Sequence, residues 1–228
     1  MSVNLYFSEK GYGTPLVLLH GNGEDGGFFK NQIDFFAAKY RVITPDTRGH
    51  GRSPRGTEPF TFDTFADDLK NLLCSLGIEK AHILGFSDGG NIAAVFALKY
   101  PEYVESLILN SANLSPAGLK KSFLIKARAD YLKYCLLSHF KKKAQKRREL
   151  LHLMVKQPDI KPEQLKSIKC PTLVVAGTHD LITAGHTRLI ADSIPGARLV
   201  FIEGGHDIAQ TASVEFNKTV ERFLEETL

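Results

Sequence analysis

The chain has 228 residues, of which 43% are hydrophobic and 24% charged, and its formal net charge is +4. These values are typical of a soluble globular protein with one sizeable core, and no run of eighteen apolar residues predicts a transmembrane helix. The first residues have neither a basic start nor a long apolar stretch, so no signal peptide is predicted.

Short apolar runs alternate with segments of helical periodicity along the chain. This alternation predicts an α/β fold with a mainly parallel sheet flanked by helices. Each expected strand is β-branched or leucine-rich and is bounded by Gly, Pro, Asn or Asp. An edge strand is expected around residues 3–8, and core strands are expected at residues 15–19, 41–44, 81–86, 104–110, 172–176 and 198–202.

Helices are expected between these strands. Apolar residues recur at intervals of three and four over residues 62–76, behind the capping candidate Thr61. Residues 91–98 are apolar nearly all round and stop before Pro101, which is typical of a helix buried against a sheet. Residues 211–228 carry one apolar face and predict a terminal helix.

Residues 113–165 interrupt this alternation, because they predict two or three amphipathic helices and no strand. The segment is too short for a core of its own, so we expect a helical lid inserted within a single domain of residues 1–228. It holds thirteen basic and four acidic residues, a formal charge of +9 against −5 for the remainder. Such charge could contact nucleic acid or an anionic membrane, or form a solvated helix face. We expect the solvated face, with no nucleic-acid and no membrane partner.

The three cysteines, Cys74, Cys135 and Cys170, are odd in number and share no metal-like spacing. Cys74 follows two leucines on an apolar face, so we expect a buried thiol there. This cysteine usage favours a reducing, cytoplasmic location.

The chemistry is expected at Ser87, within the motif GFSDG, which fits G-x-S-x-G. The motif lies between an expected strand and an expected helix, where a sharp turn pushes the serine hydroxyl out of the sheet. Gly85 and Gly89 are needed because a Cβ at either position would collide with the neighbouring strand or helix. The following helix points free N–H groups at the reaction centre.

A serine hydroxyl needs a base, and the base needs an acid to hold it. The segment LVVAGTHD puts Asp180 in the loop after one expected strand, and LVFIEGGHD puts His206 in the loop after the next. The loop NSANLS, the other plausible place for the acid, has no carboxylate. We therefore predict a catalytic triad of Ser87, Asp180 and His206.

The oxyanion of the reaction needs two N–H donors. One is expected to be the backbone N–H of Asp88, the residue after the nucleophile. The other is expected in the loop HGNGED, from the backbone of Asn22. The Asp88 carboxylate either complements the dipole of its helix or also binds substrate, where it would attract a cation such as an α-ammonium group.

The other histidines have structural explanations. His20 and His50 lie beside glycines in tight loops and are expected to make structural hydrogen bonds, and His139 and His186 fall on expected helices. No histidine has a metal-like partner at i+2 or i+4, so no metal site is predicted.

With these residues identified, the chain resembles the α/β-hydrolase superfamily over nearly its whole length. The segments that carry the resemblance are LLHGNGE, DTRGHGRS, GFSDGG, VVAGTHDLI and GGHD. The Ser-Asp-Gly-Gly turn looks most like the biphenyl-hydrolase-like branch, which includes amino-acid ester hydrolases. The resemblance implies acyl transfer through an acyl-serine with no cofactor, and a lid where residues 113–165 fall.

The sequence thus predicts a serine hydrolase of small carboxylic esters, with partner proteins unknown. A thioesterase, a lactonase or a carbon–carbon bond hydrolase could use the same triad, and a non-catalytic ligand receptor could use the same scaffold. A nucleophile that is serine and not aspartate argues against dehalogenase or epoxide hydrolase chemistry. The lid is short for the superfamily, so short or medium acyl groups are expected, with Phe123, Ala127, Tyr131 and Tyr134 facing the pocket mouth.

Overall fold

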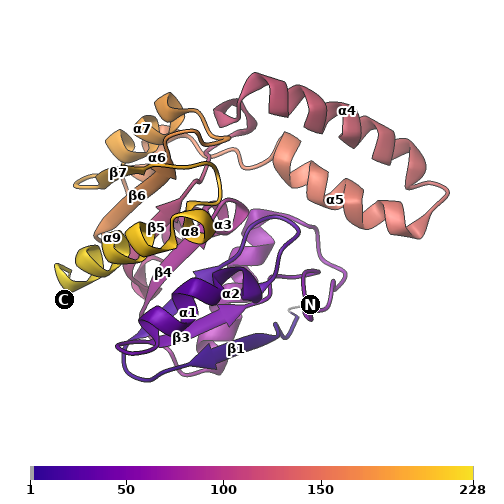
Figure 1. Cartoon of the computed structure of the whole chain (residues 1–228). Coiled ribbons are helices and arrows are strands. Elements are labelled where there is room, and N and C mark those ends of the chain that lie inside the picture. The colour runs from indigo at the N-terminus through magenta and orange to yellow at the C-terminus, as the bar shows by residue number, and fades with distance from the viewer. Residues whose placement is uncertain (1–2, 228) are drawn as a thin grey trace.

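A computed structural model of the chain describes residues 3–227 and every side chain among them except that of Lys142. Within these residues seven strands form one sheet in the order β1-β3-β2-β4-β5-β6-β7, and only β1 runs antiparallel to its neighbour (Figure 1). The predicted α/β fold class, with a mainly parallel sheet flanked by helices, is confirmed. The strands are β1 (Phe7–Lys10), β2 (Pro15–Leu19), β3 (Arg41–Pro45), β4 (Ala81–Phe86), β5 (Val104–Asn110), β6 (Thr172–Gly177) and β7 (Arg198–Ile202).

The edge strand lies later in the chain than expected. Residues 3–6 form no strand, because the Tyr6 N–H donates to the Ser53 hydroxyl at 2.8 Å instead of to a neighbouring strand. Pairing with β3 begins only at Phe7, opposite Pro45. The prediction for residues 3–8 was therefore wrong in its bounds.

Helices cover both faces of the sheet (Figure 1). One apolar core joins the sheet to α2, α3 and α7, and a second joins it to α1, α8 and α9. The bounds are α1 (Lys30–Phe36), α2 (Phe62–Ser75), α3 (Asp88–Lys99), α7 (Ala184–Ser193), α8 (Ile208–Thr211) and α9 (Ser213–Glu225). Short 3₁₀ turns occupy Gly26–Phe29, Pro101–Tyr103 and Pro116–Gly118.

One predicted helix begins where the sequence indicated, and two others differ from their predicted bounds. The Thr61 hydroxyl accepts a hydrogen bond from the Thr64 N–H at 3.2 Å, so the predicted cap of α2 is confirmed. Helix α3 begins at Asp88, three residues before the expected start. The predicted terminal helix is two helices, α8 and α9, with Ala212 between them, and Leu228 lies outside the described residues.

Between β5 and β6 the chain leaves the sheet and forms α4 (Lys121–Leu137), α5 (Lys142–Lys156) and the short α6 (Pro162–Leu165). Helices α4 and α5 lie side by side and project beyond the rest of the molecule (Figure 1). We call this pair the α4–α5 hairpin. It contains most of residues 113–165, and as expected no strand of the sheet falls in that segment.

A buried ion pair fastens the loop that follows β3 to α2. The Nε and Nη2 atoms of Arg48 each lie 2.6 Å from a carboxylate oxygen of Asp68, and both side chains are buried. Two matched hydrogen bonds compensate each charge for its lost hydration. The pair therefore holds this loop, which contacts His20, against the body of the protein.

Two further features concern the surface. Cys74 is exposed, so the predicted buried thiol was wrong: its sulfur lies outside the core, 3.1 Å from the Tyr103 hydroxyl. Among residues 3–227, no helix combines the length and apolar character needed to cross a membrane.

Candidate active site

Ser87 lies in the sharp turn between β4 and α3. Its φ is +53°, a backbone conformation that non-glycine residues rarely adopt and that concentrates at functional sites. A Cβ on Gly85 would lie 2.1 Å from the Gly89 oxygen, and a Cβ on Gly89 would lie 2.0 Å from the Leu19 oxygen. Both glycines are therefore required by close backbone approach, as the sequence predicted.

The structure brings Ser87, His206 and Asp180 together. The three residues follow β4, β7 and β6, and parallel strands end at the same edge of the sheet. The His206 Nε2 atom lies 2.9 Å from the Ser87 Oγ, and the Nδ1 atom lies 2.6 Å from the Asp180 Oδ1. A single imidazole thus connects the hydroxyl to the carboxylate.

Asp180 is held by more than the histidine. Its Oδ2 accepts a hydrogen bond from the Ser111 hydroxyl at 2.6 Å, and its Oδ1 accepts one from the Ile182 N–H at 2.9 Å. Burial, the largest influence, would raise the pKa of this carboxyl. The hydrogen bond and charge of His206, together with the bonds from Ser111 and Ile182, outweigh burial, so the pKa lies below its ordinary value. The acid is therefore ionised at neutral pH.

Ser111 is a site residue that the sequence reasoning missed. It stands in the loop that was noted only for lacking a carboxylate, and its φ of +56° is again in the left-handed region. In that conformation its hydroxyl faces Asp180 across a gap of 69 residues in sequence. A serine in a polar loop gives no local signal for such a contact.

The backbone N–H groups of Asn22 and Asp88 donate to no group among residues 3–227. Asn22 follows β2 and Asp88 opens α3, so both line the same pocket as the Ser87 hydroxyl. His20 holds the first of these loops: its Nδ1 donates to the Gly21 oxygen at 2.8 Å, and its Nε2 accepts from the Thr47 N–H at 3.0 Å. The expected structural role of His20 is confirmed.

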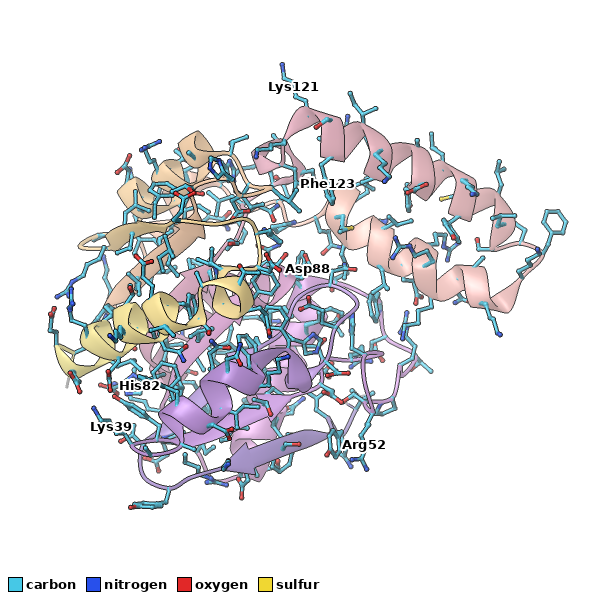
Figure 2. All side chains as sticks on the ribbon, viewed as in Figure 1. Lys39, Arg52, His82, Asp88, Lys121 and Phe123 are labelled. Carbon is cyan, nitrogen blue, oxygen red and sulfur yellow. The ribbon has the colours of Figure 1, made fainter. Side chains whose placement is uncertain are left out.

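The Asp88 carboxylate is buried beside Ser87, at the gap between the body and the α4–α5 hairpin (Figure 2). The Asn22 side-chain amide donates to one of its oxygens at 2.7 Å, and the Asn91 amide lies 3.4 Å from the other. Burial raises the pKa of this carboxyl to about 6, although these amides and the nearby His206 favour its charged form. Asp88 is therefore mostly ionised at pH 7 and protonated below about pH 6.

A pocket of about 290 Å³ opens at Ser87. Its polar wall holds three carboxyl groups, those of Glu24, Asp88 and Asp207, and no lysine or arginine with a described side chain lines it. Glu24 was not foreseen: its carboxylate accepts from the Gly21 N–H at 3.0 Å, and burial raises its pKa. Its apolar wall is made by Phe86, Leu119, Phe123, Met154, Leu181 and Ile182.

Of the α4 residues expected at the pocket mouth, only Phe123 lines the pocket, where it lies on the side of α4 that faces the body (Figure 2). The expectation was wrong for Ala127, Tyr131 and Tyr134. The hairpin projects away from the body after the first turn of α4, so these residues lie farther out, and Tyr131 contacts His152 of α5 instead.

The remaining histidines have ordinary partners. The Nδ1 of His50 lies 3.0 Å from the Arg48 oxygen, and the Nε2 of His186 accepts from the Leu114 N–H at 2.9 Å. His139 lies just beyond the end of α4, not on a helix as expected. Over residues 3–227, no three His, Cys, Asp or Glu side chains cluster in a way that could hold a metal ion.

Comparisons with known proteins agree with this architecture. The family model of the alpha/beta hydrolase fold matches residues 14–134, more than half of the chain. RutD of Caulobacter sp. (strain K31), provisionally named a carbamate hydrolase, is 29% identical over 246 residues, 92% of this chain and 90% of RutD. The human serine hydrolase BPHL is also 29% identical over 246 residues, 98% of this chain and 84% of BPHL.

A solved structure is similar over a comparable length. The thermophilic esterase of Thermogutta terrifontis superposes with a TM-score of 0.81 at 25% identity, covering 99% of this chain and 94% of the esterase. The family match, the relatives and the shared sheet topology lead to one conclusion: the chain belongs to the α/β-hydrolase family and is a hydrolase.

Proposed function

We propose that the protein cleaves small carboxylic esters through an acyl-enzyme formed on Ser87. The observation that carries this proposal is the hydrogen-bonded chain from the Ser87 hydroxyl through His206 to Asp180, at the floor of a pocket. Three groups in this order can make a serine hydroxyl nucleophilic near neutral pH.

In the first step, the His206 Nε2 takes the proton of the Ser87 hydroxyl as its Oγ bonds to the carbonyl carbon of the ester. The resulting oxyanion accepts hydrogen bonds from the backbone N–H groups of Asn22 and Asp88. The C–O bond to the alcohol then breaks, and His206 gives the proton to the departing oxygen. A water molecule, deprotonated by His206, then attacks the acyl-serine in the same way and releases the carboxylic acid. Throughout, Asp180 orients the imidazole and stabilises its charged form.

The pocket supports a small substrate without negative charge. A volume of about 290 Å³ is at the lower end for ligand pockets, which favours short or medium acyl groups. The three carboxyl groups on its polar wall outnumber the one basic side chain described there, that of His206, and would repel an anionic acyl group. The substrate class is therefore neutral or cationic esters.

We further propose that residues 113–165 act as a lid within a single domain of residues 1–228. Leu119, Phe123 and Met154 come from this segment and form one wall of the pocket. The Asn22 side-chain amide, which contacts Asp88, also donates to the Leu150 oxygen of α5 at 3.0 Å. The lid is thus tied to the loop that supplies one of the proposed oxyanion donors.

Asp88 is the proposed substrate-binding residue. Its buried carboxylate lines the pocket next to the nucleophile and is ionised above about pH 6, so it could bind the ammonium group of an amino-acid ester. A charge-assisted contact of this kind contributes roughly 1.5–3 kcal/mol, or about ten- to a hundredfold in relative rate. The comparison of amino-acid esters with their des-amino analogues in wild type and Asp88→Asn tests it, and equal rate ratios in the two proteins would exclude it.

The experiment for the reaction itself combines a fluorophosphonate label with a panel of activated esters, thioesters, lactones and carbamates. We expect the label on Ser87, ester turnover in the wild type, and loss of turnover by several orders of magnitude in Ser87→Ala, with the fold retained. Wild-type turnover in Ser87→Ala would refute the mechanism. No reaction of the wild type with any substrate or with the label would favour a ligand receptor.

A further inference from the structure

The solvent-exposed side of the α4–α5 hairpin carries large apolar side chains, although a surface in contact with water usually carries polar ones. Eight large hydrophobic side chains among residues 3–227 are exposed, and four of them lie on this one hairpin. They are Ile125, Leu132, Leu136 and Phe140, with exposed fractions of 68%, 65%, 71% and 86%. Contiguous exposed apolar surface of this kind marks an interaction site more often than a solvated face.

Helical geometry explains why these residues form one patch. Intervals of seven and four place Ile125, Leu132 and Leu136 on one side of α4, and Phe140 follows directly after the helix ends. Phe123 and Ala127 lie on the opposite side of α4, where Ala127 is buried. The helix therefore has two apolar sides, of which the body and α5 cover one. We call the uncovered set, Ile125, Leu132, Leu136 and Phe140, the outer stripe.

Basic side chains border the outer stripe. By helical position Lys121 and Arg128 lie along one flank, and Lys126 and Lys133 lie along the other. All four are exposed, and none forms an ion pair with a described residue. Figure 2 shows Lys121 pointing away from the body at the N-terminal end of α4, where the hairpin begins. The hairpin thus presents apolar and positive groups together on its free side.

The combination of apolar and basic side chains indicates which partner could cover the outer stripe. A second copy of the chain would cover the apolar residues but would bring two positively charged hairpins together, which is unfavourable. A nucleic acid would neutralise the charge but would leave the leucines exposed. The surface of an anionic lipid bilayer satisfies both, because acyl chains receive the apolar side chains and head groups receive the basic ones.

We propose that the outer stripe and its basic border dock the protein on the surface of an anionic membrane. Helix α4 would lie in the plane of the interface, with Leu132 and Leu136 below the head groups. This docking differs from spanning: the helix stays associated with α5 and does not cross the bilayer. The proposal departs from the expectation of no membrane partner, which rested on interpreting the basic segment as a solvated helix face, because the outer stripe is visible only once α4 is folded.

The test is co-sedimentation of the purified protein with vesicles of phosphatidylcholine alone or mixed with phosphatidylserine. The apolar variant is Leu132→Gln with Leu136→Gln, and the charge variant is Lys126→Gln with Lys133→Gln. The matched controls are Leu189→Gln with Val214→Gln, two exposed apolar residues of the body, and Lys30→Gln with Lys218→Gln, two exposed basic ones. None of these residues lies in the pocket, so turnover of a soluble ester reports whether each variant is folded.

We expect the wild type to bind the vesicles that contain phosphatidylserine and not to bind those of phosphatidylcholine alone. The charge variant should bind about 25-fold more weakly, since each basic residue at an anionic surface contributes about fivefold to partitioning. The apolar variant should also lose binding, and both control pairs should bind as the wild type does.

Three results would overturn the proposal. The first is equal sedimentation with and without vesicles. The second is binding that depends on Lys126 and Lys133 but not on Leu132 and Leu136, together with tight binding of RNA or DNA at physiological salt, which would identify a polyanion site. The third is a dimer in solution that the apolar variant converts to a monomer, which would show that a second copy covers the outer stripe.

Discussion

The buried carboxyl of Asp88 predicts a defined dependence of stability on pH. Its pKa is about 6 in the folded protein and 3.8 in an unfolded chain, because burial penalises the charged form. The folded state therefore binds this proton more tightly than the unfolded state does. Its contribution to stability is fully present below about pH 4 and is lost as the pH rises through about 6. A difference of two pKa units corresponds to about 3 kcal/mol.

Replacing Asp88 with asparagine keeps the size of the side chain and one acceptor oxygen for the Asn22 amide, but removes the charge. We expect the free energy of unfolding of Asp88→Asn, relative to wild type, to rise by about 3 kcal/mol between pH 4 and pH 7. At acidic pH the two proteins should differ little, because both side chains are then neutral.

The assay is urea denaturation of both proteins in steps across this pH range, followed by circular dichroism. The control is Asp34→Asn, since Asp34 is exposed and forms only a surface ion pair with Lys10. That control should show a small difference that changes little with pH. A difference between wild type and Asp88→Asn that stayed constant from pH 4 to pH 7 would refute the reasoning that burial controls this carboxyl.

Three further predictions concern other parts of the molecule. Ser111→Ala removes the 2.6 Å hydrogen bond to Asp180, so kcat should fall about tenfold or more with little change in KM; an unchanged kcat would show that the hydrogen bond is dispensable. Asp68→Asn leaves the buried Arg48 uncompensated, so urea denaturation should show a loss of about 3–5 kcal/mol, and a loss below about 1 kcal/mol would contradict a buried pair. Gln157 lines both the pocket at Ser87 and a neighbouring cavity of about 410 Å³, so Gln157→Ala should join them and shift the preference toward longer acyl groups; an unchanged chain-length profile would mean that the cavities stay separate.

Some parts of the candidate site could be predicted from the sequence, and others could not. The Ser87 turn could be predicted because its requirements are local: a strand, a helix and two glycines at positions where a Cβ would lie about 2 Å from backbone oxygen. His206 and Asp180 could be predicted because each follows a strand that the apolar pattern reveals, and parallel strands deliver their loops to one edge. The proposal of their catalytic roles therefore stands on both the sequence and the geometry.

Other parts depended on contacts between distant segments. The hydroxyl of Ser111, the amide of Asn22 on Asp88 and the carboxylate of Glu24 on the pocket wall each depend on where a loop meets another element. Helix α4 shows the same limit. Its pattern is apolar on two sides, and a sequence cannot tell which side the body covers or where the hairpin leaves the body. Phe123 was therefore placed correctly, whereas Tyr134, on the same side of the helix but farther out, was not.

The sequence by itself determined the α/β class, the order of the strands along the chain and the three residues proposed for catalysis. These depend on periodicity, on glycine at crowded turns and on strand ends, all of which act over a few residues. Only the tertiary structure decided how large and how acidic the pocket is, which groups set the ionisation of Asp88 and Asp180, and which side of α4 remains uncovered. These properties depend on burial and on hydrogen bonds between segments up to 128 residues apart, such as that from Asn22 to Leu150, and no local pattern encodes them.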